Sequence, residues 1–265
     1  MLEELTRIVR AAGEIILSAG AERGVREKTG PRDLVTVYDT RVQAFLQREL
    51  LASFPEAAFL GEEGFEEKVF PADEWLFIVD PIDGTTNFIQ GYRNSCVSVG
   101  LMHRGRMECG VVYNPYDGEC YTAQRDRGAF RNGIPIHCAD RDLEHSLLIF
   151  GTALYYRDLV DQTMTLFNRA FPLVQDVRRF GSAALDLCYV AAGKAGVFFE
   201  CRLCPWDYAA GSLIAAEAGC RVTQIDGSPL RFDRKCSVLV GAPTAYAGLR
   251  EAFRGSAPNP NATDR

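Results

Sequence analysis

Residues 80–88 read DPIDGTTNF, and they directly follow the apolar run WLFIV at residues 75–79. The apolar run is typical of a buried strand, whereas the segment after it carries two aspartates, two threonines and an asparagine. Pro81 cannot donate a hydrogen bond to a sheet, and Asp83-Gly84 is typical of a turn. We therefore expect the strand to stop before Pro81 and the backbone to bend, so that the two carboxylates converge.

The oxygen atoms of this segment suit a magnesium ion. Asp80 and Asp83 lie three residues apart on the bent backbone, with the carbonyl of Ile82 between them. Carboxylates, carbonyls and waters are the ligands that Mg²⁺ prefers. Thr85 and Thr86 begin a helical turn, where hydroxyls and N–H groups can hold a phosphate or orient a water. An Asp-Gly turn capped by a threonine explains the same letters, so the segment alone leaves both interpretations open.

Further acids lie elsewhere in the chain where they can join such a site. Glu62 and Glu63 belong to GEEG, a loop whose glycines let side chains reach inward, whereas we expect Glu66 and Glu67 to form a solvated acidic surface. Asp207 stands at the start of a very apolar helix, where an acid also interacts favourably with the helix dipole. Each acid therefore has a structural explanation as well as a functional one.

Small and charged residues give three more candidate contacts. Gly181-Ser182-Ala183 opens a helix, where small residues leave N–H groups open to a ligand oxygen or permit close helix packing. Glu200 ends the strand GVFFE and can accept hydrogen bonds from ligand hydroxyls or face water. Lys28, in the polar loop REKTGPRD, can pair with a phosphate or carboxylate or be an ordinary surface charge.

The composition excludes several classes of protein. The 265 residues are 47% hydrophobic with a net charge of −6 and no basic stripe, which argues against nucleic-acid binding. No apolar run is long enough to span a membrane, and the N-terminus lacks the pattern of a signal peptide, so the nine cysteines are expected to be reduced cytoplasmic thiols. No phosphate-binding loop with Lys-Ser/Thr, Gly-x-Gly-x-x-Gly motif or zinc spacing is present, and Cys201 with Cys204 forms a single pair.

The hydrophobic pattern gives helices, then antiparallel strands, then alternating elements, which predicts an α+β fold. An amphipathic helix opens the chain, and a second one covers DLVTVYDTRVQAFLQRELLASFP with Asp33 as a candidate cap. We expect one domain over residues 1–254, with packed halves at about 1–145 and 146–254, and a disordered tail at 255–265. The later strands are expected at 75–79, 95–101, 108–113, 119–123, 147–150, 173–178, 196–200 and 237–241, and the later helices at 158–170, 181–193 and 206–219.

Taken together, three segments resemble the marker motifs of the inositol monophosphatase family and stand in the family's order: GEEG (61–64), DPIDGTTNF (80–88) and WDYAAG (206–211). The segments DLVTVYD (33–39) and GSAALDL (181–187) are also similar to family segments. The resemblance covers nearly the whole chain up to about residue 245. It implies a five-layered αβαβα sandwich, dependence on two to three Mg²⁺ ions, sensitivity to lithium and a homodimer.

The resemblance also assigns roles to particular residues. It implies that the metal ligands are Glu62, Asp80, Asp83, Asp207 and the carbonyl of Ile82. It implies that Thr85 and Glu62 orient the attacking water. Lys28 corresponds to a lysine of the family's flexible loop, and Asp39 to the aspartate that supports the threonine. The residues implied to contact the substrate or its phosphate are Asp83, Gly84, Thr85, Gly181, Ser182, Ala183, Glu200 and Asp207.

The expected reaction is hydrolysis of a small phosphorylated polyol or sugar, with myo-inositol monophosphate as the first candidate. Two features depart from the family pattern: the letters LCP before Trp206 and the segment FGTALYYRD at 150–158. In addition, Arg178-Arg179 lies just before Gly181 and is compatible with a second phosphate or a nucleotide. Fructose 1,6-bisphosphate, histidinol phosphate, NADP and 3'-phosphoadenosine 5'-phosphate are therefore alternative substrates on the same fold. An aspartyl-phosphate mechanism is disfavoured because it needs acids two residues apart, and a protein that binds a phosphorylated ligand without turnover is the non-enzymatic alternative.

Overall fold

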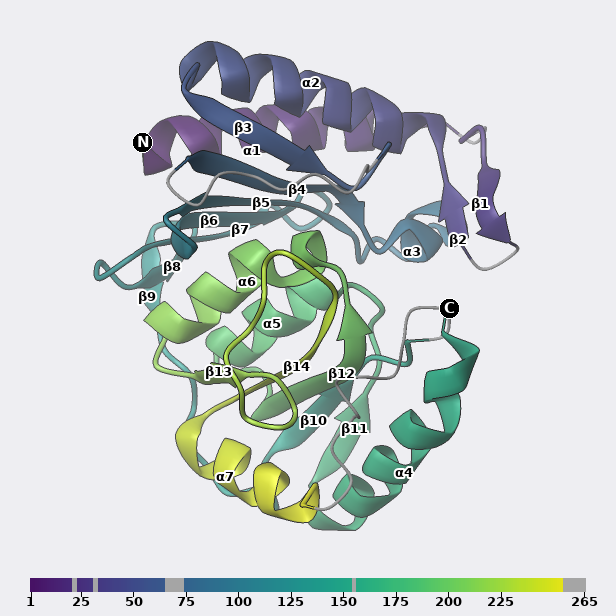
Figure 1. Ribbon diagram of the computed structural model, residues 1–265, viewed down its shortest axis with the longest axis vertical. Helices are drawn as coiled ribbons and strands as arrows, with labels where there is room; N and C mark the ends of the chain where they lie inside the picture. The colour runs from purple at the N-terminus through teal and green to yellow at the C-terminus, as the bar shows by residue number, and fades with distance from the viewer. Residues whose placement is uncertain (21–22, 31–32, 65–73, 154–155, 255–265) are drawn as a thin grey trace.

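The computed structural model describes residues 1–20, 23–30, 33–64, 74–153 and 156–254. Helices and sheets alternate in five layers (Figure 1). The helices of the first layer are α1 (Leu2–Leu17) and α2 (Val37–Ser53), those of the middle layer are α5 (Ala183–Ala191) and α6 (Pro205–Glu217), and those of the last layer are α4 (Val160–Ala170) and α7 (Pro243–Ala252). The expected α+β sandwich is therefore confirmed.

The first sheet has seven strands in chain order, all antiparallel except the first pair. Its strands are β3 (Ala57–Gly61), β4 (Trp75–Asp83), β5 (Cys96–His103), β6 (Arg106–Asn114), β7 (Glu119–Gln124), β8 (Ala129–Arg131) and β9 (Ile134–Ile136). Because side chains alternate between faces, Phe77 and Val79 of β4 pack with the residues of α1 and α2, whereas Leu76 and Ile78 pack with those of α5 and α6. Burial on both faces explains why β4 reads as a continuous apolar run.

The second sheet has five strands in the order β11-β10-β12-β14-β13. Their bounds are β10 (Leu147–Phe150), β11 (Asp176–Arg178), β12 (Val197–Leu203), β13 (Arg221–Thr223) and β14 (Cys236–Gly241). The strands β11, β10 and β12 are parallel, and β14 is antiparallel to its two neighbours. Three chain segments thus leave the same edge of the sheet at the ends of β10, β11 and β12.

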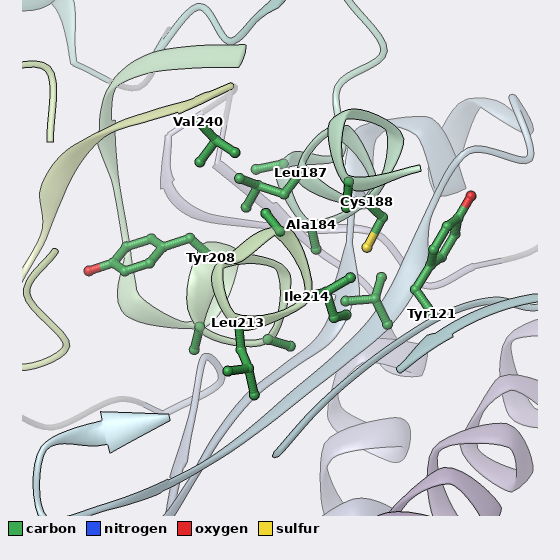
Figure 2. Close-up of a cluster of buried hydrophobic side chains, with 14 of the residues drawn as sticks. Tyr121, Ala184, Leu187, Cys188, Tyr208, Leu213, Ile214 and Val240 are labelled. Atoms are coloured by element: carbon green, nitrogen blue, oxygen red, sulfur yellow. The ribbon is translucent and has the colours of Figure 1, made fainter. Parts of the chain in front are cut away.

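The middle layer is enclosed between the two sheets. Figure 2 shows Leu187 of α5 and Ile214 of α6 packed among buried side chains that include Tyr121 from the first sheet and Val240 from the second. Gly211 permits this close packing, since a Cβ there would lie 2.9 Å from Leu187. A helix buried on all sides must be apolar all round, which accounts for the small-residue sequences of α5 and α6.

The structure corrects the expectation that β4 stops before Pro81. The strand continues to Asp83, but its register shifts: Asp80 lies opposite Ser98, and Asp83 lies opposite Cys96. Three steps along β4 therefore match two steps along β5, which defines a β-bulge and leaves Pro81 within the irregular stretch.

The polar loop expected before the second helix is also corrected. It contains a two-stranded antiparallel ribbon, β1 (Arg26–Gly30) with β2 (Asp33–Val35). The helix α2 begins only at Val37, and its cap is Thr36 rather than Asp33. Thr36 accepts from the N–H of Asp39, and Asp39 accepts from the N–H of Thr36, so the two residues form a capping box that the pattern analysis missed.

The remaining differences are short elements with weak hydrophobic periods. The sequence pattern did not predict β3, β8, β9, β13, α7 and the short helices α3 (Thr85–Gln90) and η2 (Phe171–Leu173), although a helical turn was expected at Thr85. The short helix η1 (Arg157–Leu159) coincides with the start of the helix expected at 158–170. The predicted tail at 255–265 and the acids Glu66 and Glu67 lie outside the described residues. Among the described residues, no helix is both long and apolar enough to cross a membrane.

Candidate metal and phosphate site

Three aspartates from two distant parts of the chain meet between the layers. One carboxylate oxygen from each of Asp80, Asp83 and Asp207 lies within 4.8 Å of the others. The bulge of β4 explains the first two, because their partners Ser98 and Cys96 are two residues apart on β5 and so share a face. Asp207 joins them from the first turn of α6.

Asp83 is held by the N-terminus of α5. Its Oδ2 accepts hydrogen bonds from Ser182 Oγ at 2.6 Å and from the N–H of Ala184 at 2.7 Å. The N–H of Ala183 also faces this carboxylate. The small residues at the start of α5 therefore position an acid of the cluster, a structural role beside the ligand contact expected for them.

The other two aspartates are fixed by their own local backbone. Asp80 Oδ1 accepts from the N–H of Ile82 at 3.0 Å, which stabilises the bulge. Asp207 Oδ2 accepts from the N–H of Cys204 at 2.7 Å and thereby caps α6. In each case one carboxylate oxygen has a described protein partner, and the carboxylate as a whole still points toward its neighbours in the cluster.

Packing several acids together is electrostatically costly. Burial raises the pKa of Asp80 well above its ordinary value, and Glu62, Asp83 and Asp207 raise it further. Burial and the same repulsion also raise the pKa of Asp207. Burial raises the pKa of Asp83 to about 6, although Ser182 and Ala184 oppose the shift. Oxygen donors that repel one another in a buried site fit a hard divalent cation, which would remove the repulsion.

Glu62 lies beside the three aspartates but is already paired. Its carboxylate is hydrogen-bonded to Asp80 and lies 2.9 Å from Lys28 Nζ, which also contacts Glu63 at 2.5 Å. Burial opposes the charge of Lys28, but both glutamates raise its pKa. The structure thus brings the predicted lysine to the edge of the acidic cluster through Glu62.

Thr85 lies directly after the cluster, with its hydroxyl between two acceptors. Its Oγ1 lies 3.0 Å from the carbonyl of Ile82 and 3.3 Å from Asp39 Oδ1. Asp39 is fully buried, and its other oxygen accepts from both the N–H and the hydroxyl of Thr36. The capping box of α2 therefore fixes the carboxylate that contacts Thr85.

The turn at Gly84 completes this side of the site. Gly84 has φ of 87°, a conformation that favours glycine, and a Cβ there would lie 3.0 Å from the carbonyl of Asn94. Asn87 then donates to the carbonyls of Asn94 at 2.8 Å and Phe180 at 2.7 Å. The asparagine of DPIDGTTNF thus ties the turn to the segment that precedes α5.

Glu200 lies close enough to Asp83 for the two carboxyls to interact electrostatically. It accepts from the N–H of Ala153 at 3.0 Å, and burial raises its pKa to about 7. Glu200 is one of the predicted site residues, whereas its partner segment, Gly151 to Ala153, was not predicted from the sequence. The available signal was the segment FGTALYYRD, which departs from the family pattern.

The cysteine pair does not form a site of its own. Cys201 is buried among the side chains of α4 and α7, whereas Cys204 packs against the core of the middle layer. Cys204 follows the end of β12, so the two thiols pack in different parts of the core.

Comparison with known proteins agrees with the fold. The chain belongs to the inositol monophosphatase family, whose model matches residues 1–256. A relative from Vibrio cholerae, named Nus factor SuhB, is 38% identical over 259 residues, with 96% of each chain covered. The Inositol-1-monophosphatase of Bacillus subtilis is 35% identical over 251 residues, covering 92% of this chain and 93% of the relative.

A solved structure supports the same conclusion. The extragenic suppressor protein suhB from Bartonella henselae aligns with a TM-score of 0.88 at 32% identity, covering 96% of this chain and 98% of that one. The expected family and fold are therefore confirmed. The relatives carry different names, so the family alone does not select one substrate or partner.

Proposed function

We propose that this protein is a Mg²⁺-dependent phosphomonoesterase that acts on a small polyol phosphate, with myo-inositol monophosphate as the first candidate. The observation that carries the proposal is the convergence of Asp80, Asp83 and Asp207 beside the hydroxyl of Thr85. The B. subtilis relative's name supports the candidate substrate. We further propose a homodimer in the cytoplasm, since the resemblance implies the dimer and all nine cysteines are free thiols.

The proposed metal ligands are Asp80, Asp83, Asp207, Glu62 and the carbonyl of Ile82, for two to three Mg²⁺ ions. A bound Mg²⁺ supplies positive charge for the phosphoryl oxygens and makes a nearby water more acidic. The chain itself fixes the orientation of the three aspartate carboxylates, through the hydrogen bonds of Asp80, Asp83 and Asp207 to Ile82, Ser182 and Cys204 respectively. Burial raises the pKa of Glu62, and Lys28 opposes this shift while it holds the carboxylate in place.

Thr85 is the proposed water-positioning residue. A hydroxyl has one hydrogen and two lone pairs, and the hydrogen of Thr85 is directed to Asp39 or to the Ile82 carbonyl. The lone pairs are then free to accept from a water, whose own lone pair is turned toward the phosphorus. Glu62 is proposed to accept the other proton of that water.

The proposed substrate contacts lie on both sides of the cluster. The first N–H groups of a helix have no partner within the helix. We therefore propose that the N–H groups of Gly84 and Thr85, at the start of α3, donate to phosphate oxygens. The backbone of Gly181, Ser182 and Ala183 and the carboxylate of Glu200 are proposed to contact the substrate's hydroxyls. Asp207 and Asp83 complete the contact surface near the leaving oxygen.

An assay of phosphate release from a panel of small phosphomonoesters tests the function. We expect release that requires Mg²⁺ and is inhibited by lithium, and we expect Asp83→Asn to reduce it by more than about a hundredfold. The exposed Asp161→Asn on α4 is the matched control and should leave the rate unchanged. Full activity in the Asp83→Asn variant would refute the proposed metal-dependent reaction.

Two alternatives give different results. In an aspartyl-phosphate mechanism, a single turnover in H₂¹⁸O would place label in a protein carboxylate, whereas direct attack by water places it in the released phosphate. A protein that binds a phosphorylated ligand without turnover would show calorimetric binding of myo-inositol 1-phosphate in Mg²⁺ with no phosphate released.

A further inference from the structure

Cys138 and Cys220 lie far apart in the sequence but next to each other in the fold. Cys138 belongs to the segment that connects β9 of the first sheet to β10 of the second, and Cys220 lies between α6 and β13. The N–H of Cys138 donates to the carbonyl of Ala218 at 2.9 Å. The position that a Cβ of Gly219 would occupy lies 3.7 Å from Cys138 Sγ. The backbone therefore fixes Cys138 against the end of α6, beside the residue that precedes Cys220.

A hydrogen bond joins the two thiols, with Cys220 as the donor. The donated hydrogen stabilises a thiolate on the other sulfur and lowers the pKa of Cys138 to about 7, although burial and Asp140 oppose the shift. The same hydrogen bond and burial raise the pKa of Cys220. One sulfur of the pair is thus favoured as the nucleophile, while the other stays protonated beside it.

The other thiols differ from Cys138 in charge and in exposure. All nine cysteines lie in the described part of the chain. Burial raises the pKa of every thiol outside the pair, namely Cys96, Cys109, Cys120, Cys188, Cys201, Cys204 and Cys236. Besides Cys138, only Cys204 is partly exposed, and the charge of Asp207 disfavours its thiolate further. Because the thiolate is the reactive form, Cys138 is expected to react first.

We propose that Cys138 and Cys220 form a modification site that a hydroperoxide converts reversibly to a disulfide, with Cys138 as the attacking sulfur and Cys220 as the resolving one. This inference concerns a separate part of the molecule and does not depend on the proposed phosphatase activity. Disulfides of this transient kind are the ones found in reducing compartments.

The reaction has two steps. The Cys138 thiolate attacks one oxygen of hydrogen peroxide, so that an S–O bond forms, the O–O bond breaks and hydroxide leaves. The sulfur of Cys220 then attacks the sulfenic sulfur, so that the S–S bond forms and the S–O bond breaks, and its proton leaves with the hydroxyl group as water. The hydroxide takes up the proton that Cys138 lost on ionisation. The two thiols lose two electrons in total, and the peroxide becomes two waters.

The disulfide would link two connections of the fold without entering the acidic cluster. Cys220 follows the C-terminal end of α6, whereas Asp207 lies in the first turn of that helix. The bond would close the chain between residues 138 and 220, which removes conformational freedom mainly from the unfolded state. We therefore expect the oxidised protein to be the more stable form.

Peroxide treatment of the reduced full-length protein tests the proposal. In limiting hydrogen peroxide without reductant, we expect two of the nine thiols to be lost, as measured with a thiol reagent in denaturant, and dithiothreitol to restore both. Trypsin places Cys138 in the peptide 132–141 and Cys220 in the peptide 203–221. Mass spectrometry of the digest should show these two peptides linked. The second peptide also contains Cys204, so the same linkage is expected in Cys204→Ala.

Two serine variants separate the steps. In Cys220→Ser the hydroxyl can still donate to Cys138 but no disulfide can form, so peroxide should leave a sulfenic acid on Cys138 that dimedone traps. Cys138→Ser should slow the loss of thiols by more than about tenfold, because the remaining thiols are protonated. Cys204→Ala is the matched control, since it removes the other partly exposed thiol and should leave this rate unchanged. Thermal unfolding of the reduced variants checks that each one is folded.

The linked protein should unfold at a temperature about 5 °C or more above that of the reduced protein, and peroxide should give no such rise in Cys220→Ser. A linked protein without this rise would contradict the expected stabilisation. Linkage of Cys138 to any other cysteine or to a second copy of the chain would overturn the proposed pair. Oxidation of Cys138 no faster than that of the buried thiols would equally overturn the modification site.

Discussion

At the scale of single residues, the hydroxyl of Thr85 is the link between the acidic cluster and the first helical layer. It contacts the Ile82 carbonyl on one side and Asp39 on the other, and Asp39 is fixed by Thr36. A side chain with one hydrogen and fixed acceptors has a defined orientation of its lone pairs. That orientation, rather than any charge on Thr85, is what the proposed reaction requires.

Thr85→Val retains the shape of the side chain and removes the hydroxyl. We expect kcat for phosphate release to fall by about 10²-fold or more, with KM changed little, because a positioned proton acceptor typically contributes that much. Thr85→Ser retains the hydroxyl and should keep most of the activity. Steady-state kinetics of both variants, with thermal unfolding to confirm folding, gives the comparison; equal kcat in the two variants would contradict the role of the hydroxyl.

At the scale of elements, the short helix α3 begins and ends at glycines with left-handed backbone. Gly84 has φ of 87° and Gly91 has φ of 76°. A Cβ at Gly84 would lie 3.0 Å from the carbonyl of Asn94 and 3.2 Å from that of Gly181, whereas a Cβ at Gly91 would have no neighbour within 4 Å. A side chain at Gly91 would therefore cause conformational strain alone, whereas a side chain at Gly84 would cause both strain and a steric conflict.

Alanine at each glycine distinguishes the two effects. Both variants should lose about 1–2 kcal/mol of unfolding free energy from the left-handed conformation. Gly84→Ala should lose more and should also lower kcat, because the backbone on either side of the site must move. Urea unfolding and steady-state assays measure both quantities. A Gly91→Ala variant as impaired in kcat as Gly84→Ala would show that strain in α3, not crowding at the site, is responsible.

At the scale of the whole molecule, the acidic cluster joins the first sheet to the middle layer of helices. Asp80 and Asp83 come from the first sheet, whereas Asp207 and the partners of Asp83 come from α6 and α5. Repulsion between the carboxylates destabilises the packing of these layers, whereas burial of the apolar core stabilises it. Stability of the metal-free protein should therefore depend on the protonation of the cluster.

The pKa of Asp83 rises from 3.8 to about 6 on folding, so the folded state holds its proton more tightly than the unfolded state. The stability that this provides is present below pH 3.8 and is lost as pH rises through about 6, a difference of about 3 kcal/mol at most. We expect urea unfolding in EDTA to show falling stability across this window, and Mg²⁺ to remove most of the fall. A slope unaffected by Mg²⁺ would contradict metal binding at the cluster.

Much of the fold follows from hydrophobic periods in the sequence. Strands β4 to β7 and the buried helices α5 and α6 were predicted because residues packed on every side leave long apolar runs. The bulge at Pro81 was not predictable, since it is a property of the register between β4 and β5. The capping box of Thr36 and Asp39 has a local signal, but it was overlooked because Asp33 also suited a cap.

The candidate site divides in the same way. Its acids were named from the sequence because their spacing and the family resemblance identified them. The different surroundings of Arg178 and Arg179 were not predictable, because neighbouring side chains at a strand end take directions set by distant residues, here Asp176 and Thr152. The local sequence does not indicate which of two neighbouring arginines pairs with a carboxylate.

The position of Asp207, far along the chain from Asp80 and Asp83, has a consequence for biosynthesis. A ribosome releases the chain from its N-terminus, so the first sheet can fold while α6 is still being translated. The nascent protein then carries two acids of the cluster without the third, and without the serine that holds Asp83. Any activity that depends on the complete cluster therefore appears only near the end of translation, and incomplete chains are inert.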